Sequence, residues 1–140
     1  FHRDLQRLKA ELQLYNKQEN VWVIAQGVNN SSGNLVLHLV GNLNTYIGSI
    51  LGNTGYVRNR EKEFSQKDVS IDFLLEKIDQ TDAMVKTVIS LLSESDFKQN
   101  YPIQVWDTVD MNTELFLVHL LGHLNYHLGQ ISYHRRLLDN

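Results

Sequence analysis

Apolar residues recur at intervals of three and four along most of this chain, and a single proline, Pro102, occurs in its 140 residues. This spacing places side chains on one face of an α-helix, and the scarcity of proline leaves long helices uninterrupted. No alternating pattern typical of strands competes with it. The sequence therefore predicts an all-α protein.

Four long segments carry this periodicity. They extend from about Asp4 to Glu19, from about Ser32 to Leu51, from near Ser70 to Leu92, and from Asn112 or Thr113 to Leu138. Helices of these lengths predict a four-helix bundle that forms a single domain over residues 1–140. The connection from Leu51 to Ser70 is long for a helical hairpin, and we expect it to cross the bundle. The stretch from Phe97 to Asp110, which contains YPIQVW, is predicted to form a short extended piece.

Composition excludes several classes of function. Cysteine is absent, which excludes a disulfide scaffold, a thiol nucleophile and a thiolate metal site. The net charge is −3 with both signs scattered, so no nucleic-acid partner is expected. No apolar run approaches the ~18 residues of a membrane span, and the start FHRDLQRLKAEL is unlike a signal peptide. We therefore expect a soluble, cytoplasmic protein with no membrane partner.

Three histidines, His119, His123 and His127, follow one another at four-residue intervals in the run LVHLLGHLNYHLGQ. On a helix they spread over about 80° at the border of the apolar arc. A step of four residues is the spacing of a metal-chelating pair. His123 and His127 are the best such pair, because bundles build metal sites from inward-facing residues on neighbouring helices.

A third ligand must come from another helix, and His38 is the candidate. It lies in LVLHLVGNL, where an imidazole among Leu and Val needs a polar partner. His38, His123 and His127 could then meet at one divalent metal and leave coordination positions open for water or substrate, as in catalytic sites. The alternative for each histidine taken alone is a hydrogen-bonded residue of the core.

The remaining histidines are assigned other positions. His119 lies about 80° and about 12 Å from His127, too far to share its metal, so it is predicted to line the pocket or to contact a ligand. His134 lies about 10 Å beyond His127, and His2 lies near the terminus. Both are predicted to face solvent.

Small and polar residues surround the candidate ligand on the second helix. Gly41, Thr45, Gly48 and Gly52 form a seam that predicts close helix packing, with room for a ligand or a dimer partner as the alternative. Asn42, one turn after His38, is predicted to hydrogen-bond a ligand or the substrate. For Asn34, one turn before it, a capping or solvated role is predicted.

Arginines and aromatic residues receive ordinary structural interpretations. Arg58 and Arg60 are predicted to be solvated, with binding of an anionic group as the alternative. Four aromatic residues are predicted to lie in the core or to form pocket walls: Trp22, Tyr46, Trp106 and Tyr126.

Two motifs together, LxLHLxGNL in the second helix and HxxxHxxxHxGQ in the last, resemble the DinB/YfiT superfamily over nearly the whole chain. The stretch GYVRNREKEF resembles an uncharacterised branch of it. The resemblance implies an up-down-down-up four-helix bundle, often a homodimer, with a divalent metal held by His38, His123 and His127. Gln130 completes the last motif, and the resemblance implies that it orients a ligand or caps the pocket, with a polar contact in helix packing as the alternative.

The resemblance implies a metal-dependent enzyme, either a thiol S-transferase or a small-molecule hydrolase, because some members of the superfamily transfer low-molecular-weight thiols. Zinc and nickel are the favoured metals, and iron and manganese fit the same nitrogen donors. The substrate would be a small molecule, with a low-molecular-weight thiol as one candidate. No general base is evident, since Glu114 lies two or more turns from the ligands. The alternative is a noncatalytic bundle with a structural, vestigial or ligand-sensing metal site.

Overall fold

The computed structural model describes residues 1–105 and 111–139. Its elements, in chain order, are α1 (His2–Gln13), η1 (Gln18–Trp22), α2 (Ser32–Leu43), η2 (Asn44–Leu51), α3 (Arg60–Ser65), α4 (Ile71–Leu91), α5 (Glu94–Lys98) and α6 (Thr113–Leu138). The described ranges contain no strand, and their one isolated β-bridge pairs Asn100 with Asn112. The predicted all-α class is confirmed.

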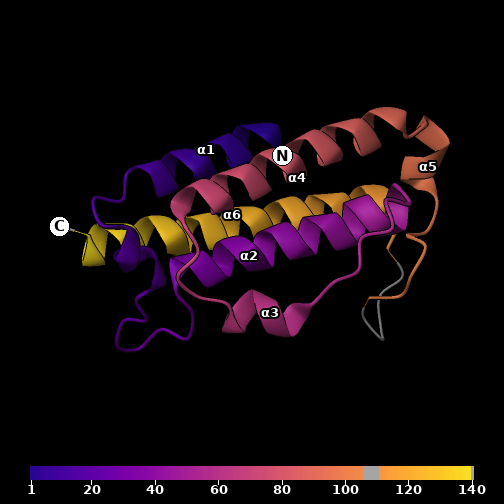
Figure 1. The fold of residues 1–140 in the computed structure, drawn as a ribbon. Coiled ribbons are helices and arrows are strands. Elements are labelled where there is room, and N and C mark those ends of the chain that lie inside the picture. Colours follow the sequence, from indigo (N-terminus) through magenta and orange to yellow (C-terminus); the bar gives the residue numbers. More distant parts are fainter. Residues whose placement is uncertain (106–110, 140) are drawn as a thin grey trace.

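The long helices α1, α2, α4 and α6 form the bundle, as Figure 1 shows. Following the sequence colours, α1 and α6 run in one direction, and α2 and α4 run in the other. This is the predicted up-down-down-up order. It places α2 beside α6 in antiparallel orientation, so that the second and last helices share a seam along the bundle.

Side-chain caps fix the starts of three long helices. The Ser31 hydroxyl accepts the amide N–H of Asn34 at 3.2 Å before α2, and the Ser70 hydroxyl accepts that of Phe73 at 3.1 Å before α4. The side chain of Asn112 caps α6 in the same way. Because these caps satisfy amides that have no partner inside the helix, the predicted starts near Ser32, Ser70 and Thr113 are confirmed.

The predicted end of the first helix at Glu19 is wrong, since α1 ends at Gln13. The chain turns there because the backbone amides of Asn16 and Lys17 donate to the carboxylate of Asp139, at the far end of α6. These amides bond to a side chain from another helix instead of to carbonyls one turn back. A tertiary contact therefore ends the helix.

The second predicted helix is continuous from Ser32 to Leu51, but its second half, η2, is a π-helix. Its glycines lie against α4. A Cβ on Gly48 would lie 3.2 Å from the sulfur of Met84, and a Cβ on Gly52 would overlap the side chain of Val88. The prediction of close helix packing is confirmed at these two glycines.

Residues 52–70 return the chain along the bundle so that α4 can run parallel to α2, which confirms the predicted crossing connection (Figure 1). This crossover contains α3, which packs against α2. Neither α3 nor α5 was predicted, because helices of 6 and 5 residues are too short to show a clear period. Of the extended piece predicted over Phe97–Asp110, the structure describes residues up to 105, and the bridge at Asn100 is its only extended pairing there.

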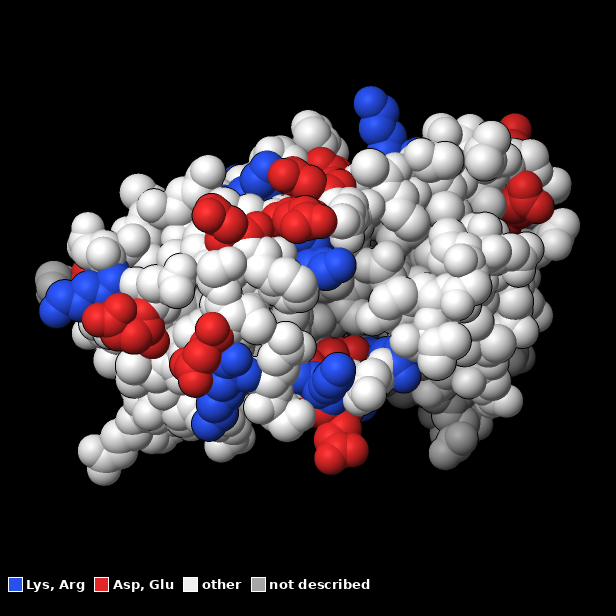
Figure 2. All heavy atoms as spheres, in the orientation of Figure 1, with Lys and Arg blue, Asp and Glu red and all other residues white. Residues whose placement is uncertain are grey.

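The core is formed by leucines, isoleucines and valines that the four long helices direct at one another. On the face drawn in Figure 2, lysine and arginine side chains alternate with aspartate and glutamate, so this face has no large region of one sign. Among the described residues, every helix is too short or too polar to traverse a lipid bilayer.

Candidate metal centre

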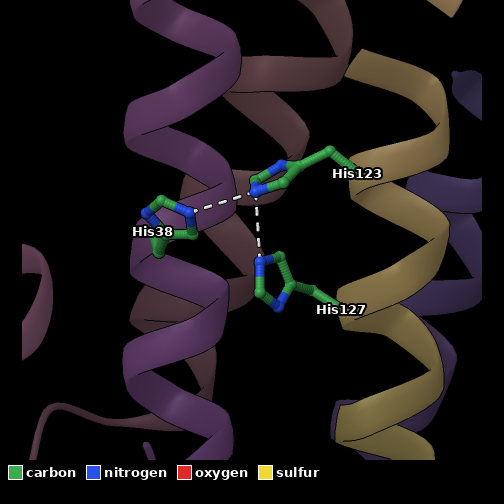
Figure 3. Close-up of side chains that lie close together, drawn as sticks. All are labelled: His38, His123 and His127. Carbon is green, nitrogen blue, oxygen red and sulfur yellow. Dashed lines mark hydrogen bonds between the residues drawn. The ribbon is translucent and has the colours of Figure 1, made fainter. Parts of the chain in front are cut away.

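His38 on α2 and His123 and His127 on α6 point toward one another across the seam between the two helices (Figure 3). Each offers a ring nitrogen, and these atoms all lie within 4.8 Å of one another. His38 is buried, with 7% of its surface exposed, and the other two are half-buried. The structure thus brings together the three histidines that the sequence singles out.

Two of the three distances between the ring nitrogens fit a coordination sphere. The Nε2 atom of His123 lies 3.3 Å from Nε2 of His38 and 3.1 Å from Nε2 of His127. Two nitrogens bound to one metal at about 2.0–2.1 Å lie about 2.9 Å apart at right angles and about 3.4 Å apart at the tetrahedral angle. Both observed distances fall inside this interval.

A carboxylate fixes the tautomer of His38. Its Nδ1 atom lies 3.0 Å from Oε2 of Glu63, which is on α3 and is 5% exposed. Because an ionised carboxylate only accepts hydrogen bonds, this shorter contact assigns the proton to Nδ1 and leaves the Nε2 lone pair for the cluster. Nη2 of Arg58 lies 3.3 Å from the same Nδ1 and then donates to Glu63 instead. Donation from a ligand histidine to a carboxylate is the usual arrangement behind a metal-binding imidazole.

Arg58 holds this carboxylate from the other side. Its Nε donates to Oε1 of Glu63 at 2.7 Å and its Nη2 donates to Oε2 at 2.8 Å. Gly41 makes the room, since a Cβ there would lie 2.7 Å from the carboxyl carbon of Glu63.

The prediction that Arg58 is solvated is wrong, because pairing with a buried carboxylate draws its side chain inward, leaving 15% exposed. Arg60 is exposed, as predicted.

An amide fixes the tautomer of His127. Its Nδ1 atom lies 2.6 Å from Oε1 of Gln130, one turn further along α6. If the amide oxygen accepts this hydrogen bond, Nε2 again keeps its lone pair for the cluster. The position of Gln130 thus fits the expectation that it orients a neighbouring histidine.

Burial and the neighbouring imidazoles lower the pKa of both His123 and His127. Burial, together with the neighbouring His127 and His38, lowers the pKa of His123 to about 4. Burial also lowers the pKa of His127, although its bond to Gln130 opposes the shift. At neutral pH both imidazoles therefore offer lone pairs.

The carboxylate behind the cluster keeps its charge. Burial opposes ionisation of Glu63, but hydrogen bonds from His38 and Arg58 hold its pKa below its ordinary value. The same bond to Glu63 raises the pKa of Arg58. Glu63 and Arg58 therefore both stay ionised at neutral pH, and the carboxylate of Glu63 stays available to accept the hydrogen bond from His38.

Protons alone do not satisfy the convergent nitrogens. With His38 and His127 both protonated at Nδ1, only His123 can supply an Nε2 proton, and it has two close Nε2 neighbours. Within the described ranges, Nδ1 of His123 is buried and has no hydrogen-bond partner. A set of lone pairs that meets in a buried space suits a cation better than a single shared proton. The residues present therefore fit a divalent metal.

Two further residues were predicted to lie beside the ligands. His119 is exposed, and its ring stacks on that of His123 with centroids 6.5 Å apart. Asn42 is buried, and its side-chain oxygen has no hydrogen-bond partner among the residues that the structure describes. Its predicted bond to a ligand or substrate stays a prediction.

Asn34 was predicted to be capping or solvated. It is buried, and its side-chain oxygen accepts the hydroxyl of Ser31, the N-cap of α2, which agrees with the capping alternative. Its amide donates to the backbone carbonyls of Glu63 and Gln66, which ties α3 to α2.

The prediction that His134 faces solvent is wrong. The residue is 8% exposed, and its ring lies 2.7 Å from the Tyr15 hydroxyl through Nδ1 and 2.8 Å from the Val23 carbonyl through Nε2. Residues on either side of η1, which include Tyr15 and Val23, pack against α6 and cover His134. The side chain of His2 is largely exposed, as predicted, and pairs with Asp82.

The aromatic predictions have mixed outcomes. Trp22 is buried and its ring abuts Gly33, and Tyr46 is half-buried against Phe116. Tyr126 is 65% exposed, so its predicted place in the core or a pocket wall is wrong. It points outward because it precedes His127 by one residue, which places it about 100° from that ring around the helix. Trp106 lies outside the described residues.

The chain is similar to known proteins in sequence and in structure. The family model described as "Protein of unknown function (DUF1572)" matches residues 4–140. The structure is similar to the crystal structure of a DinB-like protein from Bacillus cereus ATCC 10987, with a TM-score of 0.68 and 20% sequence identity, over 96% of this chain and 85% of that one. No curated protein sequence matches the chain.

Proposed function

Because the chain belongs to the DUF1572 family and has a DinB-like fold, we propose that His38, His123 and His127 bind a divalent metal in an enzyme that acts on a small molecule. The observation that carries the proposal is the convergence of three Nε2 atoms. Oxygen acceptors stand behind two of these rings, at Glu63 and Gln130. A site with three protein ligands leaves room for a substrate atom, as catalytic sites do.

The reaction that we propose is transfer of a low-molecular-weight thiol or hydrolysis of a small substrate. When bound, a divalent metal supplies Lewis acidity, which lowers the pKa of a coordinating thiol or water. Zinc and nickel are the preferred metals for three imidazoles, and iron and manganese are weaker candidates. The choice among these metals rests on ligand chemistry. The choice between the two reactions rests on the resemblance to the superfamily, since a fold alone does not imply a reaction.

In this proposal the chain's own residues bind and orient. Glu63 and Gln130 hold His38 and His127 in the tautomers that leave Nε2 open. Arg58 keeps Glu63 charged and in place. The side-chain oxygen of Asn42, which has no partner in the described part of the chain and lies one turn from His38, accepts a hydrogen bond from the substrate.

One observation favours the noncatalytic alternative. Glu63, the carboxylate that contacts the cluster, already accepts bonds from His38 and from two nitrogens of Arg58. A general base needs a lone pair available to the substrate, and this carboxylate has little to spare. A bundle that binds metal without turnover would have the same contacts.

Metal analysis and an activity assay test the proposal in two steps. Protein purified without a histidine tag and loaded with zinc or nickel should retain about one equivalent, and His123→Ala should retain none. Conjugation of a thiol to an electrophile should then depend on the metal and stop with a chelator. Failure to retain any divalent metal would overturn the proposal, whereas one tightly bound metal without conjugation or hydrolysis would favour the noncatalytic bundle.

We also propose that the protein forms a homodimer through the outer face of α6. Leu115, Val118 and Tyr126 are exposed there at helical spacing, and Gly122 between them has open space around it. Exposed apolar residues in a row on one helix are typical of an interface. Analytical ultracentrifugation should show a dimer that Tyr126→Glu converts to a monomer. A wild-type monomer at all concentrations would overturn this assignment.

A further inference from the structure

A cleft of about 350 Å³ lies between the end of α6 and the start of α2, and the loop that precedes α2 borders it. We call it the α2–α6 cleft. It is lined by Ala25, Gly27, Val28, Asn29, Asn30, Leu35, Gln130, Tyr133, His134, Leu137 and Leu138. Its volume is within the range of small-molecule sites, about 300–1,000 Å³.

The α2–α6 cleft continues the face that carries the histidines. At 100° per residue, Gln130, His134 and Leu137 all lie within about 40° of His123 around α6. Leu35 lies one turn before His38 on α2. Gln130 belongs to both places, since it lines the cleft and bonds to Nδ1 of His127. The cleft therefore starts about one turn, roughly 5 Å, from His127 and follows α6 for about 10 Å more.

The wall of the cleft is held in place. His134 lies 2.8 Å from the carbonyl of Val23 and 2.7 Å from the hydroxyl of Tyr15, which fixes the start of the bordering loop against α6. The loop then turns at Gly27, whose φ of +83° is easily adopted only by glycine. After this turn Val28 lines the cleft. The buried histidine thus shapes the wall of the cleft.

The lining residues define the chemistry of a ligand. None of them is Lys, Arg, Asp or Glu, although 21% of the chain is charged. Alanine, valine and leucine side chains dominate, and the amides of Asn29, Asn30 and Gln130 supply polar groups at the edges. An ionised group placed here would lose water without gaining an opposite charge. The cleft suits an uncharged, mainly apolar molecule.

We propose that the α2–α6 cleft binds the uncharged, mainly apolar body of the small-molecule substrate, whose reacting group lies at the three histidines. The position of the reacting group at the histidines rests on the proposed function, whereas binding of an apolar molecule in the cleft does not. In a thiol transfer, the two substrates then bind at different places. The apolar electrophile occupies the cleft, and a charged thiol approaches from elsewhere.

The cleft can be tested without metal. Binding of 1-butanol, 1-hexanol and 1-octanol to chelator-treated protein is measured by ¹H–¹⁵N NMR. We expect the dissociation constant to fall about threefold to fourfold per methylene, with shifts at the amides of Leu35, Gln130 and Leu137. Affinity that is independent of chain length, or shifts confined to other parts of the protein, would overturn the proposal.

Matched variants locate the binding. Ala25→Trp fills the cleft and should weaken 1-octanol binding at least tenfold, whereas Ala83→Trp, at an exposed position on α4, should leave it within twofold. If Ala25→Trp does not fold, Leu137→Asp places a charge in the cleft at an exposed position and should have the same effect. Wild-type binding by a folded cleft variant would overturn the proposal.

Hydroxamates connect the cleft to the histidines, because their head group chelates divalent metals. On zinc-loaded protein, octanohydroxamate should bind at least a hundredfold more tightly than acetohydroxamate, and Ala25→Trp should remove this advantage without weakening the shorter compound. Equal affinities would overturn the shared site and leave the metal proposal standing. If neither hydroxamate binds while the alcohols do, the proposed function and the connection to the histidines both fail.

Discussion

Two histidines on α6, His123 and His134, lie about three turns apart and differ in their partners. His134 has a protein oxygen at each ring nitrogen, from Tyr15 and Val23. His123 faces two other imidazoles through Nε2, and its buried Nδ1 has no partner in the described parts of the chain. Burial alone does not separate a histidine that stabilises the fold from one that awaits a ligand. The partners of its nitrogens do.

The largest expected effect is the loss of metal binding in His123→Ala. Removing one of three ligands should weaken zinc binding by more than about 100-fold, beyond the effect of changing an outer partner. Competition with a chromophoric chelator measures the affinity. His134→Ala is the control and should bind zinc within about threefold of wild type. Equal losses in both variants would erase the contrast between the two environments.

Glu63→Gln should weaken zinc binding by about 10-fold to 100-fold, because the charge that supports His38 is lost while an acceptor remains. Glu61→Gln, at an exposed position on the same short helix, is the matched control and should have no effect. Unchanged affinity in Glu63→Gln would show that His38 does not need its carboxylate.

Gly41→Ala tests the same support without altering a charged group. The added Cβ cannot coexist with Glu63 in its present position, so the carboxylate must move away from His38. We expect a loss of zinc affinity of about tenfold, comparable to that from an outer partner. Gly122→Ala, where a Cβ meets open space, is the control. Retained affinity together with an unmoved His38–Glu63 bond would contradict this expectation.

His134→Ala should lower the free energy of unfolding by about 2 kcal/mol, because the buried Tyr15 hydroxyl and Val23 carbonyl lose a partner. Urea denaturation of metal-free protein measures it. Metal-free His123→Ala should change stability by less, since the ring that it removes has a buried Nδ1 without a partner among the described residues. A greater loss of stability in His123→Ala would show that His123, and not His134, has the structural role.

The smallest effect concerns the side of α6 that faces α1. Hydrogen bonds from Arg3 and Asn125 lower the pKa of Asp4 to about 2, although burial opposes them. A carboxyl whose pKa is lower when folded stabilises the protein above its unfolded pKa and ceases to do so as the pH falls. Metal-free protein should thus lose stability between pH 4 and pH 2, by less than His134→Ala loses, because solvent screens the exposed Arg3. Asp4→Asn should lose less over this interval. An unchanged pH profile in Asp4→Asn would contradict the assignment.

Local signals carried most of the fold prediction. Ser31, Ser70 and Asn112 mark helix starts because a cap acts within a few residues, and the sequence shows it directly. The end of α1 was not predictable in this way. It depends on Asp139, more than 120 residues away, whose carboxylate accepts the amides that would otherwise continue the helix.

The candidate site was likewise predictable where its signals are local and not predictable where they depend on distant contacts. The spacing of His123 and His127 predicts a shared face, and the apolar surroundings of His38 predict that it needs a partner. Glu63 gave no such signal, because it lies in a short charged helix and meets His38 only through the path of the crossover. The one hint was Gly41, whose missing side chain makes room for the carboxylate, and the sequence does not reveal what fills that room.

The antiparallel seam between α2 and α6 has a consequence for the order in which the centre is assembled. His38, Glu63 and Arg58 lie within the first half of the chain and can meet before α6 has been synthesised. The other two imidazoles arrive with α6, which follows all the other helices. A nascent chain therefore carries an oriented histidine with nothing opposite it, and three nitrogens face one another only when the bundle closes.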